Sequence, residues 1–409
     1  MASLAFLATA GFLLNVVIGR LYGPETLGVF NICFGLFIFL SQFGSFGLQF
    51  SVLHAIAARE AHEQEEVDEI VSAGFASVLV TSTIVALVGL ACTPLFAAAF
   101  NAADIANAWV VMLPGLWAFS INKYLFGVLN GVRHMRVFAV LQALRFALML
   151  AALAALALMK APGYALTGVF TAAELLLLPL LTAYSARTIS RVRLPKTRAW
   201  VERQLSYGSR AFMSGAILEL NTRVDVLLIG VWLDATRAGI YSAALLVVEG
   251  MTQAVTVLRN NVNPLIAKYI ATGDKAGLLA FSRKLSLYFT AFMAAASVVA
   301  ILVYPLYIDL ALDGGAFYAS LPSAAILLVG LAATAAAQCF GMILAMAGKP
   351  GLHTAYVTVV MVANVALNAA LIPLMGIEGS ATATALSYVV AGLGAIVFAR
   401  AALGVRIIF

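Results

Sequence analysis

Long apolar runs follow one another along the whole chain and alternate with short polar segments. Each run approaches the roughly 20 residues that an α-helix needs to cross a hydrocarbon core about 30 Å thick. The runs lie at residues 3–19, 27–52, 71–92, 105–129, 137–158, 164–184, 211–233, 239–258, 285–308, 321–346, 356–374 and 380–399. This pattern predicts an all-α integral membrane protein with about 12 transmembrane helices.

The composition agrees with a membrane protein rather than a soluble one. Of the 409 residues, 63% are hydrophobic and only 10% are charged, and the mean hydropathy is +1.03. A soluble domain of this size cannot hide so much apolar surface from water, whereas a helix bundle in lipid has no need to. We therefore expect a chain that crosses the membrane many times.

Basic residues are concentrated in every second connection between the apolar runs. Most of the 24 Lys and Arg fall there or at the C-terminus, with the longest cluster between Arg187 and Arg203. Because Lys and Arg are retained on the cytoplasmic side, both termini are predicted to be cytoplasmic. The same rule explains the net charge of +6 without a nucleic-acid partner, and none is expected. The acidic connection 59–69 is predicted to be a solvated helical extension.

A weak internal repeat indicates a duplication. Residues 18–19 (Ile-Gly) and 28–30 (Gly-Val-Phe) are echoed at the same spacing by residues 229–230 (Ile-Gly) and 239–241 (Gly-Ile-Tyr). Each copy then holds six helices, an even number, so both copies have the same orientation in the membrane. We expect two six-helix lobes related by a pseudo-twofold axis along the membrane normal, with the substrate site between them.

The repeat also sets the predicted domain boundaries. Residues 1–184 form an N-terminal six-helix lobe, residues 185–209 a basic cytoplasmic linker, and residues 210–409 a C-terminal six-helix lobe. The connections on the predicted outer face are too short to fold as a soluble catalytic domain. This argues against most membrane enzymes.

The seventh apolar run carries charges near its middle. Glu219, Arg223 and Asp225 stand there, with Asn221 between them. A charge at the centre of an inserting helix costs about 2.5–3.5 kcal/mol, so such residues face a partner or a polar cavity. Glu219 and Arg223 are four residues apart and share one helix face. They are candidates for substrate binding, and the alternative is a structural pair that fixes helix packing.

Four further ionisable residues lie inside apolar runs. Lys123 and Arg145 are candidates for substrate binding, although either could extend its charge to the membrane interface instead. Glu174 and Glu249 are candidates for ion coupling, since a buried carboxyl group can carry a proton or bind sodium. Alternatively, each acid is protonated and hydrogen-bonded. We assign no catalytic residue.

The sequence offers no sign of a cofactor or a metal. Residues 341–349 have the wrong spacing for a phosphate-binding loop and continue into Pro350. The four histidines, His54, His62, His134 and His353, are too dispersed to have metal-ligand spacing. We therefore expect neither ATP hydrolysis on this chain, nor a metal, nor a cofactor.

Three segments carry a resemblance to a known family. Residues 220–249, LNTRVDVLLIGVWLDATRAGIYSAALLVVE, place an acidic residue before an apolar run and a Gly-aromatic turn. Residues 18–31, IGRLYGPETLGVFN, and residues 367–390, LNAALIPLMGIEGSATATALSYVV, stand near the two ends of the chain. Together they resemble the flippases of lipid-linked, O-antigen-type oligosaccharides in the multidrug, oligosaccharidyl-lipid and polysaccharide exporter superfamily.

The resemblance implies a function in the biosynthesis of surface polysaccharides such as lipopolysaccharide. Such a protein moves a polyprenyl-pyrophosphate-linked oligosaccharide from the cytoplasmic to the outer leaflet of the bacterial cytoplasmic (inner) membrane by alternating access. Arg223 would bind the headgroup phosphate, with Glu219 and Asp225 orienting it and Glu249 as a coupling acid. The expected partners are the lipid-linked glycan, membrane lipids and, as a candidate, a glycan polymerase. The chain itself is expected to be a monomer.

Two other functions remain open at this stage. A cation-coupled multidrug antiporter of the same fold needs acidic residues to bind cationic drugs. Inside its spans, the N-terminal lobe has two basic residues, Lys123 and Arg145, and only one acidic residue, Glu174. This excess of positive charge favours an anionic substrate. A membrane glycan polymerase or glycosyltransferase is expected to have charged residues on sizeable outer loops, and the outer connections here are short. We expect a transporter and not an enzyme.

Overall fold

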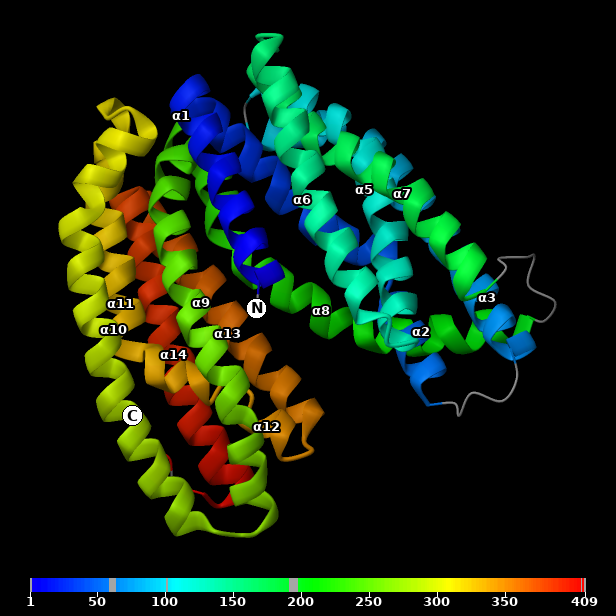
Figure 1. The fold of residues 1–409 in the computed structure, drawn as a ribbon. Helices are drawn as coiled ribbons and strands as arrows, with labels where there is room; N and C mark the ends of the chain where they lie inside the picture. The colour runs from blue at the N-terminus through cyan, green and yellow to red at the C-terminus, as the bar shows by residue number, and fades with distance from the viewer. Residues whose placement is uncertain (1, 59–63, 101, 191–197, 406, 408–409) are drawn as a thin grey trace. The chain divides into compact units, whose positions relative to one another are not determined.

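The computed structural model describes residues 2–58, 64–100, 102–190, 198–405 and 407, and every regular element in these ranges is helical (Figure 1). The α-helices are α1 (Ala2–Ser45), α2 (Leu48–Ala57), α3 (Gln64–Ala91), α4 (Thr93–Ala99), α5 (Ala103–Gly131), α6 (Met135–Leu158), α7 (Gly168–Thr188), α8 (Arg198–Trp232), α9 (Ala235–Ala271), α10 (Lys275–Leu312), α11 (Leu321–Cys339), α12 (Ile343–Met346), α13 (Pro350–Met375) and α14 (Ile377–Leu403). Two short 3₁₀ helices, η1 (Gly163–Thr167) and η2 (Gly315–Ser320), precede α7 and α11.

Ten helical segments of the described chain are long and apolar enough to cross a membrane. One of them lies in α1, whose 44 residues extend about 66 Å, enough for two crossings of a core about 30 Å thick. Gly23, with φ 82°, and Pro24 break α1 between these crossings. Helix α8 is outside the ten because charged residues interrupt its apolar run. With α1 counted as two crossings and α8 added, the prediction of an all-α membrane protein with about 12 spans is confirmed.

The chain divides into two compact units. Unit 1 consists of Met1–Asn15 and Val29–Leu220, and unit 2 of Val16–Gly28 and Asn221–Phe409. These limits differ from the predicted lobes at two places. Residues 16–28 pack within unit 2, and the described part of the predicted linker, together with residues 210–220, packs within unit 1. Residues 191–197 of that linker lie outside the described residues, as do residues 59–63 of the acidic connection, whose remainder begins α3.

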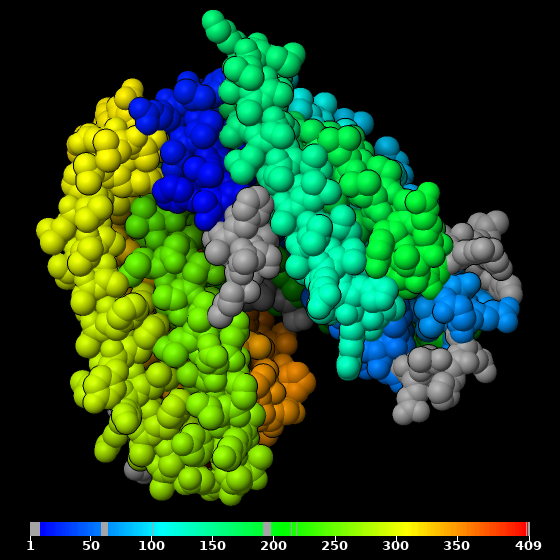
Figure 2. Space-filling view, viewed as in Figure 1, coloured from blue at the N-terminus to red at the C-terminus, as the bar shows by residue number. Residues whose placement is uncertain are grey.

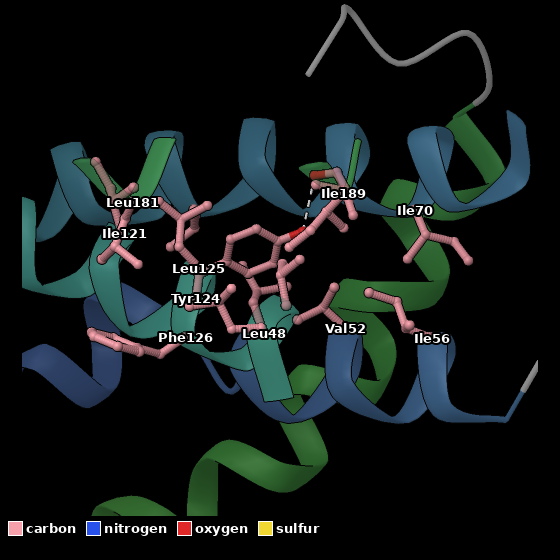
Figure 3. Packing of buried hydrophobic residues seen from close by; sticks show 14 of the residues in the cluster. Leu48, Val52, Ile56, Ile70, Ile121, Tyr124, Leu125, Phe126, Leu181 and Ile189 are labelled. Carbon is pink, nitrogen blue, oxygen red and sulfur yellow. Dashed lines mark hydrogen bonds between the residues drawn. The ribbon is translucent and has the colours of Figure 1, made fainter. Parts of the chain in front are cut away.

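Unit 1 has a core of aliphatic and aromatic side chains from α2, α3, α5 and α7 (Figure 3). Leu48 and Val52 of α2 and Ile70 of α3 are completely buried in it. Tyr124 of α5 is also fully buried, and its hydroxyl donates a hydrogen bond of 2.9 Å to the carbonyl oxygen of Val71 (Figure 3). That bond satisfies the polar end of an otherwise apolar side chain and ties α5 to α3.

The first half of α8 belongs to unit 1 because it packs closely on α2 and α3. A Cβ atom on Gly47 would overlap the carbonyl oxygen of Gly208, and one on Gly208 would overlap that of Phe46, so the two backbones touch. Gln204 is buried and donates a hydrogen bond of 2.6 Å to Ile70 O. This stretch looked like a linker in the sequence because its exposed face is rich in Arg and Ser.

Residues 16–28 belong to unit 2 through an equally close contact. A Cβ atom on Gly28 would overlap the carbonyl oxygen of Ala235, and one on Gly239 would overlap that of Pro24. The contact is reciprocal, and it joins the two glycines that correspond in the sequence repeat. Nearby, Arg20 donates a hydrogen bond of 2.6 Å to Leu310 O at the end of α10, where helix carbonyls lack intrahelical partners.

The remainder of unit 2 is built from long helices. Helix α9 has 37 residues and α10 has 38, and their side chains occupy the surface of the unit along its length (Figure 2). Helices α11 and α14 contact α9, and α13 packs against α14 (Figure 1). The apolar side chains that α10 exposes, among them Leu287, Leu302 and Leu310, are what lipid contact requires.

Candidate functional site

The charged and amide residues predicted to form the site fall in both units, because the boundary between the units runs through α8 after Leu220. Unit 1 contains Lys123, Arg145, Glu174 and Glu219, and unit 2 contains Asn221, Arg223, Asp225 and Glu249.

Arg145 and Glu174 form a buried ion pair between α6 and α7. Arg145 Nε lies 2.7 Å from Glu174 Oε1, and the two side chains are 9% and 0% exposed. Asn122 of α5 donates a hydrogen bond of 2.8 Å to the other carboxylate oxygen of Glu174. The Arg145 guanidinium also lies 5.0 Å and 4.9 Å from the ring centroids of Phe119 and Phe126. Arg145 therefore does not extend to the membrane interface, and its charge is balanced inside the unit.

Lys123 lies beside this pair on α5 but has no ion-pair partner of its own in the described chain. Its ammonium nitrogen lies 5.8 Å from the centroid of the Phe119 ring, and the side chain is half-buried. The positive charge of Arg145 opposes it and the negative charge of Glu219 attracts it, both within unit 1. Lys123 is thus better placed than Arg145 to receive an external anion.

Arg223 pairs with Glu249 in unit 2. Arg223 Nη1 lies 3.0 Å from Glu249 Oε1, and the two side chains are 20% and 41% exposed. The pair connects α8 with α9, a partnership that the sequence did not indicate. Because water reaches the carboxylate, this ion pair contributes less to stability than the buried pair in unit 1 and exchanges partners more easily.

Asp225 is buried in the helix packing of unit 2. It is 4% exposed, and one carboxylate oxygen accepts a hydrogen bond of 2.9 Å from the Tyr241 hydroxyl. The other accepts a hydrogen bond of 2.8 Å from the backbone N–H of Val226. Both oxygens are occupied, so in this structure Asp225 braces α8 against α9. Tyr241 was not among the predicted site residues, although it is the aromatic residue of the Gly-aromatic turn quoted above.

Asn221 begins a line of amide and hydroxyl groups across unit 2. Its Oδ1 accepts a hydrogen bond of 3.3 Å from Asn364 of α13, and Asn364 Oδ1 in turn accepts one of 2.8 Å from Asn368. Ser380 of α14 donates to Asn368 Oδ1 at 2.7 Å. Asn364, Asn368 and Ser380 are all buried. Asn221 was predicted from the sequence to be a site residue, and the fold shows that it joins one network across α8, α13 and α14.

The described residues contain no group of three or more His, Cys, Asp or Glu side chains that is able to hold a metal ion. Cys33 and Cys339 are buried and Cys92 is half-buried, and none of the three is in a disulfide. The site is therefore built from charged pairs, amides and hydroxyls.

Solved structures with a similar fold include membrane transport proteins. An inward-facing multidrug resistance MATE family transporter of the MOP superfamily superimposes with a TM-score of 0.81, at 13% identity, over 97% of this chain and 94% of the other. The lipid II flippase MurJ in an inward closed conformation gives 0.76, also at 13% identity, over 98% and 87%. A mutant of the Vibrio cholerae MATE transporter VcmN gives 0.62 at 13% identity, over 98% and 94%. No curated protein sequence matches the chain.

These likenesses define the class of the protein as a multi-pass, all-helical membrane protein with the fold of the MOP superfamily. The sequence adds the family. Residues 1–257 match the model of the family described as polysaccharide biosynthesis protein, and the chain belongs to that family.

Proposed function

We propose that this protein is a flippase that moves a polyprenyl-pyrophosphate-linked oligosaccharide from the cytoplasmic to the outer leaflet of a bacterial cytoplasmic membrane. Its family membership in polysaccharide biosynthesis supports a glycan substrate. The fold, shared with multidrug transporters and with a lipid II flippase, supports transport by alternating access, with no chemical reaction on the chain.

The observation that carries the proposal is the difference between the two arginine pairs. Breaking the Arg145–Glu174 pair would leave a buried charge without a counter-ion, so this ion pair is expected to remain intact during transport. The Arg223–Glu249 pair is partly hydrated, so a pyrophosphate is able to displace Glu249 and take over the guanidinium. Arginine suits this role because its planar fork matches phosphate oxygens.

Displacement of Glu249 also suggests how transport is coupled. In the structure Glu249 is the ion-pair partner of Arg223. Once the headgroup occupies Arg223, the released carboxylate is able to accept a proton or a sodium ion from the outer side. Glu174 is less suited to this role because Arg145 and Asn122 already bind both of its oxygens.

In this mechanism the other polar residues support Arg223. Asp225, bonded to Tyr241, fixes the rotation of α8 that directs Arg223 toward α9. Asn221 anchors the same helix to α13. Within unit 1, Lys123 is a separate candidate for anion binding, and the negative charge of Glu219 attracts its ammonium group when no substrate is bound.

The function is tested by deleting the gene and measuring lipid-linked glycans by mass spectrometry together with the surface polysaccharide. Accumulation of one polyprenyl-linked glycan, with loss of the matching surface polymer, supports the flippase and identifies its substrate. An unchanged lipid-linked pool with an intact surface polymer, in a host without a second transporter of this family, refutes it. In that case, increased sensitivity to cationic drugs would favour the multidrug antiporter.

A further inference from the structure

Polar residues extend well beyond Glu249 on α9, inside a segment apolar enough to cross the membrane. Gln253, Asn260 and Asn263 follow Glu249 at spacings of three to seven residues, which place them on one face of the helix. Gln253 and Asn260 are exposed, and Glu249 and Asn263 are half-buried. Amides and acids in a membrane helix avoid lipid, so this stripe faces water or a ligand.

Arg259 borders the stripe and lies beyond the end that the sequence predicted for this span. Its side chain is half-buried, and among the described residues its guanidinium forms no ion pair and no hydrogen bond. It lies within electrostatic range of the Tyr356 hydroxyl on α13 and of Cys339 on α11. Among the described residues, Arg259 is therefore a half-buried cation without a counter-ion, close enough to Cys339 and Tyr356 to influence them electrostatically.

The polar groups around Arg259 are partly unused as well. Tyr356 donates its hydrogen bond of 2.9 Å to Ala391 O, which fixes the ring. The His353 ring lies 6.1 Å from it, centroid to centroid. His353 Nδ1 and Asn263 Oδ1 are buried, and neither has a hydrogen-bond partner within the described ranges. Asn263 is one helical turn beyond Arg259 on α9, and His353 is one turn before Tyr356 on α13. Buried polar atoms are rarely left unpaired, so these atoms are available to a ligand that Arg259 binds.

Other basic residues at this end of unit 2 do not share these properties. Lys349 donates a hydrogen bond of 2.5 Å to Ala402 O. Arg283 and Lys284 of α10 are exposed, so their charges have a sufficient explanation in membrane topology. Among the described basic residues at this end of unit 2, Arg259 alone is half-buried, borders a polar helix face and has polar atoms without hydrogen-bond partners on the same or a neighbouring helix.

We propose that Arg259 is a second phosphate-binding point of unit 2, which receives the pyrophosphate of the lipid-linked glycan before Arg223 does. This inference rests on the proposed function. Glu249, the partner of Arg223, precedes Arg259 by ten residues of helix, about 15 Å along α9, and the polar stripe joins the two positions. Arg259 lies nearer the α9–α10 turn, the end proposed to be cytoplasmic, where the substrate enters.

The test measures binding of undecaprenyl pyrophosphate, without a glycan, to the purified full-length protein in detergent. Arg259→Gln is compared with the wild type and with Arg283→Gln, which removes an exposed charge near the same end. We expect Arg259→Gln to weaken binding by about tenfold, the effect of losing one hydrogen-bonded charge, and Arg283→Gln to leave it unchanged. Arg259→Lys keeps the charge and should restore part of the affinity.

Each contrary outcome has a distinct meaning. Equal affinity of Arg259→Gln and wild type overturns the role of Arg259 and leaves the flippase proposal intact. Failure of the wild type to bind the probe at all counts against the flippase proposal itself. Competition by phosphatidylglycerol at matched concentration would show that the phosphate comes from ordinary phospholipid, which also overturns a substrate site. Thermal unfolding without ligand serves as the folding control, because a purely structural Arg259 would lower the melting temperature when replaced by Gln.

Discussion

At the scale of single side chains, the two arginine–carboxylate pairs differ in how much water reaches them. Arg145 and Glu174 are sealed between aromatic rings, whereas Glu249 leaves 41% of its side chain exposed beside Arg223. The same chemical pair is therefore expected to act as a structural link in one unit and as an exchangeable site in the other. Mutations separate the two roles.

Replacing Arg223 with Ala should reduce glycan export by more than about tenfold, because the headgroup loses a charge-assisted pair of hydrogen bonds. The amount of protein in the membrane should stay the same, since the partner left behind is partly hydrated. Export is measured as surface polysaccharide in a deletion strain complemented with each variant. Arg237→Ala, which removes an exposed arginine of α9, is the control, and normal export by a well-expressed Arg223→Ala protein would contradict the assignment.

Replacing Arg145 with Ala should instead lower the free energy of unfolding by about 3–5 kcal/mol, because Glu174 stays buried without its counter-ion. Replacing both residues of the pair, as in Arg145→Met with Glu174→Leu, should recover most of that loss. Unfolding in detergent, followed by tryptophan fluorescence, measures both. If the double variant is stable but exports nothing, Arg145 has a direct role in transport and the structural interpretation is wrong.

The charged residues were identifiable from the sequence, but their partners were not. Arg145 and Glu174 are on different helices, and whether they meet depends on how α6 and α7 rotate about their axes. Each of these helices is apolar on nearly all of its faces, so the hydrophobic periodicity of the sequence does not show which face points to the protein interior. For the same reason the sequence did not show that Glu249 of α9 pairs with Arg223, although the four-residue spacing of Glu219 and Arg223 was visible.

At the scale of elements, long helices explain where the sequence prediction of the boundaries departed from the fold. Helix α8 begins at Arg198, inside the stretch predicted to be a linker, and its first half packs on unit 1. The polar face of this first half gives it a lower mean hydropathy than a membrane span, which is why the sequence predicted a linker there. Close packing at Gly47 and Gly208 is a tertiary feature, which apolar patterning does not show.

The glycines where helices touch should be sensitive to small changes. Gly28→Ala and Gly239→Ala each place a methyl group against a backbone carbonyl, and each should lower the free energy of unfolding by about 1–3 kcal/mol. Gly250→Ala is the matched control on α9, because nothing lies within 4 Å of its added Cβ, and it should be neutral or slightly stabilising. If Gly28→Ala, Gly239→Ala and Gly250→Ala all had the same free energy of unfolding, the close contact between the two helices would not contribute to stability.

At the scale of the whole molecule, the sequence predicted the fold class and the number of spans correctly, since both depend on length and hydropathy alone. The orientation in the membrane rests on the distribution of basic residues and stays a prediction. Part of the basic cluster between Arg187 and Arg203 lies outside the described residues, but the exposed turn between α9 and α10 is a suitable place to probe the orientation.

A cysteine at Thr272 should react with a membrane-impermeant maleimide only after the cells are opened, because this turn is predicted to be cytoplasmic. The experiment uses a Cys92→Ser background, since Cys92 is half-buried between α3 and α4, at the end predicted to face outward. The remaining cysteines, Cys33 and Cys339, are buried. Labelling of Thr272→Cys in intact cells would reverse the orientation and place Arg259 near the outer leaflet.

The reciprocal contact between Gly28 and Gly239 also limits how the two repeats can evolve. Each glycine faces the backbone of the other repeat at the equivalent position, as residues do across the axis of a symmetric dimer. Most positions of a duplicated gene diverge independently, but a side chain gained by either of these two residues would collide with the other copy. A six-helix ancestor that paired with itself would have needed this glycine once in its gene, and the fused chain has to keep it twice.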